Sequence, residues 1–111
     1  MNLSIRILIV FAVASLNFSA VAVVRAQTDA ELIAKGQKVY AEQKCSQCHS
    51  INGTGGKSGG NLSKAGATRD FDWLKQFTRA PKSLIPNAKM PAFQGSREEL
   101  DAVAAYLASL K

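Results

Sequence analysis

The sequence has few of the residues that build metal sites and covalent cross-links. Its 111 residues include one histidine, two cysteines and one tryptophan. A structural zinc site takes four ligands, and one histidine with two thiols cannot close it. No segment shows the alternating apolar pattern of a strand. We therefore expect helices and loops without a sheet.

Acidic residues are absent from the first 26 positions, which differ from the rest of the chain. Met1 to Arg6 is basic, and the 18 residues from Ile7 to Val24 are almost wholly apolar. This pattern, with Val24-Arg25-Ala26 at its end, is typical of a secretory signal peptide that is cut after Ala26. An uncleaved membrane anchor is the alternative, although polar residues dilute the run. We predict a cleaved signal peptide at 1–26, one domain at 27–111, no membrane span in the mature chain, and a periplasmic location.

The remaining 85 residues are mildly basic. They carry 12 basic and 8 acidic side chains, a formal charge of +4. They contain neither a basic run nor a basic helix with interleaved aromatics, so nucleic acid is not an expected partner. An acidic protein partner or solvated surface lysines account for the charge. Because so short a chain buries little apolar area, we expect a cofactor or cross-link to stabilise it.

The first predicted helix starts at a capping box formed by Thr28 and Glu31 and runs to about Lys44. Gly36 lies in its middle. A glycine there weakens a helix by roughly 1 kcal/mol relative to alanine. We therefore expect another backbone to approach Gly36 closely.

Two further helices are predicted, with loops between the three. Asp70 to Arg79 forms the middle helix, which ends before Pro81. The last helix opens at a second capping box, Ser96 with Glu99. The loop from Ile51 to Gly66 holds most of the chain's 8 glycines. Long loops in a small domain usually serve a site, so we expect these loops to surround one.

The motif that carries chemistry is Cys45-Ser46-Gln47-Cys48-His49. A Cys-x-x-Cys-His run is typical of covalent c-type haem attachment. Thiols one helical turn apart can reach the two vinyl groups on one edge of a porphyrin, and the next residue then presents its imidazole to the iron. We expect thioethers at Cys45 and Cys48, and His49 as a metal ligand oriented by a carbonyl. The cofactor is one haem c.

The same cysteines allow two interpretations without haem. Cys45 and Cys48 could close a short disulfide, or they could be the reactive pair of a thiol-disulfide oxidoreductase. The oxidoreductase needs a parallel sheet, and the sequence predicts no strands.

Met90 is the one methionine left once the signal peptide is removed. A lone methionine usually fills a gap in a core. Met90, however, lies between Lys89 and Pro91 in a non-helical loop, where it can bind the iron opposite His49. A His/Met pair raises the reduction potential and leaves no open position. We therefore predict electron transfer, with no enzyme activity in this chain alone; a haem-based ligand sensor, in which Met90 is displaced, is the alternative.

These motifs resemble the small class I c-type cytochromes of bacteria, over Asp29 to Lys111. The resemblance implies an all-α cytochrome c fold with three main helices wrapped around one haem, and a first and last helix that cross where Gly36 faces Tyr106. That family usually has a proline where this chain has Gly60, and its carbonyl accepts from the ligating imidazole. A glycine carbonyl can still accept, from a less rigid loop. The matching residues are Gly36, Tyr40, Cys45 to His49, Asn61-Leu62, Lys89 to Phe93 and Ala105 to Leu107.

Trp73 has two interpretations, as a donor to a haem propionate or as core packing. Arg69 is a possible charge partner of the propionate or a solvated surface residue. Five lysines in or near the loops either surround the haem edge and steer an acidic partner or are scattered solubility charges. They are Lys57, Lys64, Lys75, Lys82 and Lys89.

The resemblance also implies the partners. The chain would be a monomer that carries single electrons in transient complexes with other redox proteins, or the small haem subunit of a larger enzyme. A periplasmic dehydrogenase as donor and a terminal oxidase as acceptor are typical of the family.

Overall fold

The computed structural model describes residues 27–111, so the predicted signal peptide lies outside the described residues. The helices are α1 (Asp29–Glu42), the 3-10 turn η1 (Cys45–Gln47), α2 (Ala65–Thr68), α3 (Phe71–Arg79), α4 (Pro81–Leu84) and α5 (Arg97–Ser109). Three short strands are β1 (His49–Ile51), β2 (Thr54–Gly55) and β3 (Gly60–Asn61). Within this part of the chain, no helix is long and apolar enough to cross a membrane.

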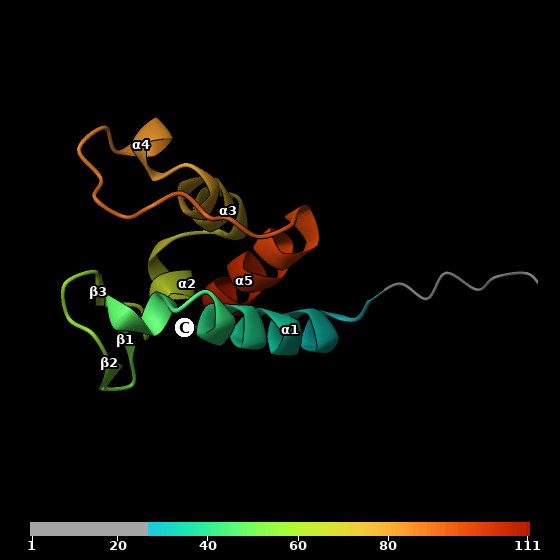
Figure 1. The fold of residues 1–111 in the computed structure, drawn as a ribbon. Coiled ribbons are helices and arrows are strands. Elements are labelled where there is room, and N and C mark those ends of the chain that lie inside the picture. Colours follow the sequence, from blue (N-terminus) through green and yellow to red (C-terminus); the bar gives the residue numbers. More distant parts are fainter. Residues whose placement is uncertain (1–26) are drawn as a thin grey trace, which may run out of the picture.

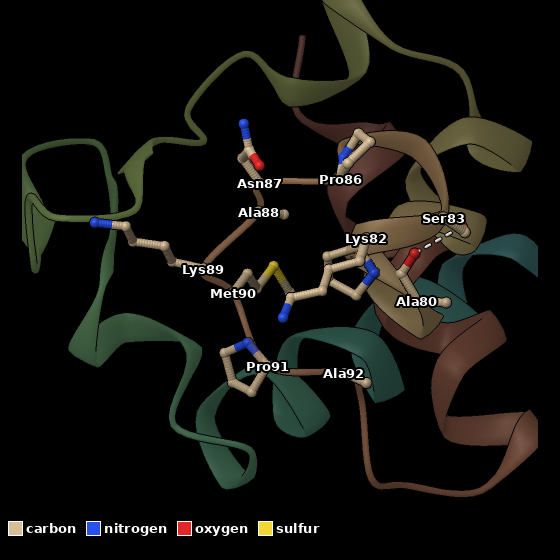
Figure 2. A pocket seen from close by; sticks show the side chains of 11 residues that line it. Ala80, Lys82, Ser83, Pro86, Asn87, Ala88, Lys89, Met90, Pro91 and Ala92 are labelled. Atoms are coloured by element: carbon tan, nitrogen blue, oxygen red, sulfur yellow. Dashed lines mark hydrogen bonds between the residues drawn. The ribbon is translucent and has the colours of Figure 1, made fainter.

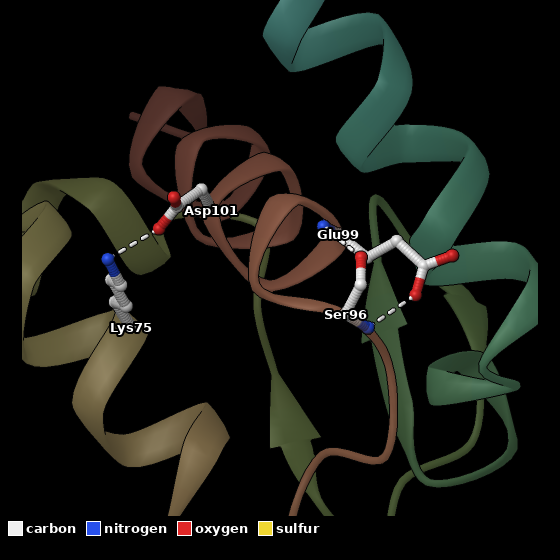
Figure 3. A network of polar contacts seen from close by, with 4 residues as sticks. All are labelled: Lys75, Ser96, Glu99 and Asp101. Atoms are coloured by element: carbon white, nitrogen blue, oxygen red, sulfur yellow. Dashed lines mark hydrogen bonds and ion pairs between the residues drawn. The ribbon is translucent and has the colours of Figure 1, made fainter.

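The three predicted helices are confirmed as α1, α3 and α5. Both predicted capping boxes are present, at Thr28 with Glu31 and at Ser96 with Glu99 (Figure 3). In each, the N-cap hydroxyl accepts from a free backbone N–H, and the glutamate accepts from the N-cap N–H. The hydrogen bonds therefore define the start of both helices.

α1 and α5 cross at Gly36, as expected. A Cβ built on Gly36 would clash with the carbonyl oxygen of Ala102 and lie 2.7 Å from the Cβ of Tyr106. One turn further along α1, the rings of Tyr40 and Tyr106 pack edge to face, with centroids 5.7 Å apart. The missing side chain of Gly36 lets the two backbones touch.

α3 packs on the same helix α5 and completes the core. Leu74 of α3 joins Val39, Leu100, Val103 and Leu107 in one buried cluster. At the rim, Lys75 forms an ion pair with Asp101 (Figure 3).

The expectation of no strands was wrong. β1 pairs antiparallel with β2 and parallel with β3, in the order β2-β1-β3. The strands are only two or three residues long, so no alternating pattern exists in the sequence to reveal them. They form because the glycine-rich loop folds back along the Cys-x-x-Cys-His segment.

The ends of α1 and α3 also differ from expectation. α1 stops at Glu42, and Lys44 adopts a left-handed conformation (φ 57°) that turns the chain into η1. After α3, Pro81 begins a further turn, α4, because proline suits the first position of a helix. Figure 1 shows α4 and the loop after it on one side of the molecule, and η1 with the strands on the other.

We predict that Gly36→Ala destabilises the protein by about 1 to 3 kcal/mol, because the added methyl overpacks the crossing of α1 and α5. Chemical denaturation measures this. If helix propensity decided the result, alanine would instead stabilise the protein by about 1 kcal/mol, and that outcome would contradict the close contact.

Candidate functional site

A cavity of about 760 Å³ lies between the two sides of the molecule. Cys45 of η1, Cys48 directly after η1 and His49 of β1 line it. Met90 lines it from the loop between α4 and α5, and Phe77 and Thr78 line it from α3. The structure thus brings the predicted attachment motif and the predicted sixth ligand to one cavity.

The two cysteines that line this cavity are free thiols. Cys45 is half-buried and Cys48 is exposed. Burial raises the pKa of the Cys45 thiol, and the nearby Cys48 adds to the rise. Reactive Cys-x-x-Cys pairs have a lowered thiol pKa. The environment of Cys45 therefore does not favour the oxidoreductase interpretation.

His49 presents its imidazole with one nitrogen already engaged. Its Nδ1 lies 3.3 Å from the carbonyl oxygen of Gly60, which accepts the bond when Nδ1 carries the proton. This tautomer leaves the lone pair of Nε2 for a metal. Gly60 has φ +89°, a conformation that proline cannot adopt. With glycine at this position, the backbone therefore adopts a conformation that a proline could not adopt. The difference is one of conformation and not only of rigidity.

The glycine loop packs directly on the attachment motif. A Cβ on Gly59 would lie 2.7 Å from Cε1 and 2.9 Å from Nδ1 of His49. A Cβ on Gly56 would clash with the carbonyl of Gln47, and the Gly56 N–H donates to Ser46 O at 2.8 Å. The glycines are thus needed because backbone and imidazole occupy the space of a side chain. Sequence analysis missed Gly59, although the Gly59-Gly60 pair was visible.

Met90 lies in the loop that faces the attachment motif. Phe93, three residues later, donates its N–H to Thr78 O at 3.1 Å, which fastens the loop to α3. A second cavity of about 900 Å³ lies between this loop and α4, and Figure 2 shows Met90 on its wall between Lys89 and Pro91. Met90 therefore forms part of the wall between two cavities.

Trp73 does not line the 760 Å³ cavity. Its ring stacks on Phe77 at 4.9 Å between centroids, and the Arg69 guanidinium lies 4.4 Å from the centroid of the Trp73 ring. Trp73 also packs against the buried cluster. This geometry favours core packing; the haem-propionate role of Trp73 stays a prediction.

Positive charge is concentrated on the segments around the cavity. Residues 43–68 and 80–96 contain five lysines and no acidic residue, whereas all 8 acidic side chains lie in or beside α1, α3 and α5. Of the five lysines considered in the sequence analysis, Lys75 forms an ion pair with Asp101, and Lys89 lines the cavity. Lys44, which sequence analysis did not single out, also lines it.

The residues of this cavity fit a covalently bound haem. The two free thiols lie next to the imidazole of His49, whose Nδ1 faces the carbonyl of Gly60, and the thioether of Met90 lines the facing wall. Phe77, Ile85 and Phe93 add an apolar lining. Residues 27–111 contain no group of three or more His, Cys, Asp or Glu side chains placed to hold a metal ion.

The family model described as "Cytochrome c" matches residues 33–111. Cytochrome c oxidase subunit 2 of Alkalihalophilus pseudofirmus is 33% identical over 86 aligned residues, covering 69% of this chain. The match covers 25% of that protein, so this chain resembles about a quarter of its length. No solved structure matches the chain. The family model spans most of the chain, with the attachment motif and Met90 inside the match, and the chain therefore belongs to the cytochrome c family, whose proteins transfer electrons with haem.

Proposed function

We propose that this protein is a one-electron carrier with a single haem attached through Cys45 and Cys48, with His49 and Met90 as the axial ligands. The supporting observation is that all four residues line one cavity, three from the attachment motif and one from the loop between α4 and α5. The three main helices would hold these two walls around the haem.

The bound haem would supply an iron that gains and loses one electron. The chain's residues set the conditions for this step. The carbonyl of Gly60 orients His49, and its hydrogen bond makes the imidazole a stronger donor. The apolar lining of the cavity limits water, and a thioether ligand raises the reduction potential. With His49 and Met90 both holding the iron, the chain would carry electrons and would not bind a substrate at the metal.

The partner side of the proposal rests on charge. The cavity segments have a net charge of +5, whereas the rest of residues 27–111 has a net charge of −1. Such asymmetry steers an acidic protein toward the cavity. The similarity to a cytochrome c oxidase subunit supports a terminal oxidase as the acceptor. We further propose that a periplasmic dehydrogenase is the electron donor. Residues 1–26 would direct export of the protein.

We predict that Met90→Ala keeps the covalent haem, lowers the reduction potential and lets the ferrous protein bind CO rapidly, because a coordination position opens. Met90→His is the matched control, since it keeps both axial positions filled: its potential falls as well, but CO binds slowly. Redox titration and CO mixing measure these effects. An unchanged potential in Met90→Ala would show that Met90 is not the ligand.

We predict that Gly60→Ala raises the reduction potential, because a strained residue 60 weakens the bond that makes His49 a strong donor. Gly53→Ala is the control variant. Gly53 has φ +83° against +89° for Gly60, and a Cβ on either glycine would meet nothing within 4 Å. Each alanine should cost about 1 to 2 kcal/mol of stability. Equal potentials in the two variants would contradict the role of Gly60.

We predict that Lys89→Glu slows oxidation of the ferrous protein by anionic ferricyanide by roughly 3- to 10-fold at low ionic strength, because the cavity mouth loses positive potential. Lys38→Glu makes the same change in net charge on α1, where Lys38 pairs with Glu42, and should have a smaller effect. Stopped-flow rates at low and high salt measure the difference, which should disappear at high salt. Equal slowing in both variants would argue against a local charge effect.

A further inference from the structure

Ser63 lies just after β3, and its hydroxyl both donates and accepts a hydrogen bond. The hydroxyl donates to Asn61 Oδ1 at 2.6 Å and accepts the backbone N–H of Asn52 at 2.7 Å. The backbone N–H of Ser63 donates to the same Asn61 Oδ1 at 2.8 Å. This half-buried serine thus connects the turn after β1 to the chain that follows β3.

The bonds of Ser63 lie at the end of the pairing that orients the imidazole. In the pairing of β1 with β3, His49 lies opposite Gly60, and the Gly60 carbonyl oxygen is 3.3 Å from His49 Nδ1. Beyond β3, Leu62 donates its N–H to Ser50 O at 2.8 Å, and the Ser63 hydroxyl makes the next contact between the two segments. Short glycine-rich strands specify their register weakly. A side-chain bond at the end of this pairing therefore helps to fix it.

Asn52, whose N–H the Ser63 hydroxyl accepts, belongs to a tight turn. Asn52 and Gly53 both have positive φ, 49° and 83°, and they join β1 to β2 where Ile51 pairs with Thr54. Two-residue turns of this kind match the twist of a hairpin and set its register. The bond to Ser63 therefore fastens the chain after β3 to a part of the site whose geometry is already fixed by the hairpin.

We propose that Ser63 is a positioning residue that, by fixing the register of β3, holds the Gly60 carbonyl at His49 Nδ1 in the haem-bound protein. The carbonyl bond makes the imidazole a stronger donor, which favours ferric over ferrous iron and lowers the reduction potential. When the hydroxyl of Ser63 is lost, β3 frays, the carbonyl bond weakens and the potential rises. This inference rests on the proposed function, in which His49 binds the haem iron.

The test compares Ser63→Ala, Ser63→Thr and Ser109→Ala in the covalently haem-loaded protein. Threonine keeps the hydroxyl, whereas Ser109→Ala removes a serine hydroxyl that donates to Tyr106 O at the end of α5. In Ser63→Ala we expect faster hydrogen exchange of the Asn52 amide, measured by NMR, and a higher reduction potential, measured by redox titration. Ser63→Thr should keep both near the wild-type values, and Ser109→Ala should change neither.

A double variant tests whether Ser63 acts through the carbonyl of Gly60. In Gly60→Ala this carbonyl bond is already weakened, so adding Ser63→Ala should change the reduction potential much less than it does in the wild-type protein. An equal shift in both backgrounds would show that Ser63 acts by another route, and it would overturn the inference.

The outcomes separate this inference from the proposed function. If the exported protein carries no covalent haem in cells that mature other c-type cytochromes, the proposed function fails and the inference fails with it. If haem is bound and Gly60→Ala raises the potential but Ser63→Ala does not, only the role of Ser63 is wrong. If Ser63→Thr raises the potential as much as Ser63→Ala does, or if exchange at Asn52 is unchanged in Ser63→Ala, the hydroxyl bond is not the cause and the inference is also overturned.

Discussion

The imidazole of His49 is held by two consecutive glycines, and the rest of the site is arranged around it. A side chain at position 59 would not fit beside the ring, and the carbonyl of Gly60 faces Nδ1 of His49. Together the two glycines limit the rotation of the imidazole ring, and Nε2 points away from them. Nε2 is the nitrogen that we propose binds the haem iron. The pairing of β1 with β3, in which His49 lies opposite Gly60, brings these glycines to the ring.

The helices and the loops have separate tasks. α1, α3 and α5 supply most of the buried apolar cluster, and every acidic side chain lies in or beside them. The segments between these helices supply most of the cavity lining and an excess of positive charge. The loop that carries Met90 has few regular hydrogen bonds, and a covalently bound cofactor would add support there. The buried apolar cluster and the excess of positive charge therefore lie largely on different parts of the chain.

The helices and the attachment motif could be predicted from the sequence because their signals are local. Capping boxes at Thr28 and Ser96 define helix starts within a few residues, and Cys-x-x-Cys-His is contiguous. The close approach at Gly36 followed from a helix-weakening residue in a helix. The short strands, α4 and the left-handed Lys44 depend on tertiary contacts and leave no periodic pattern. The burial of Thr78 was not predicted, because threonine is common on exposed helix faces.

The central claim is that one haem is covalently bound to the cysteines of the attachment motif. The most direct test is the intact mass of the exported protein after denaturation and acid-acetone extraction, which remove non-covalent haem. The account predicts the mass of residues 27–111 plus one haem, and the loss of that added mass when Cys45 and Cys48 are both replaced by alanine. The bare polypeptide mass from the native protein, in cells that mature other c-type cytochromes, would contradict it.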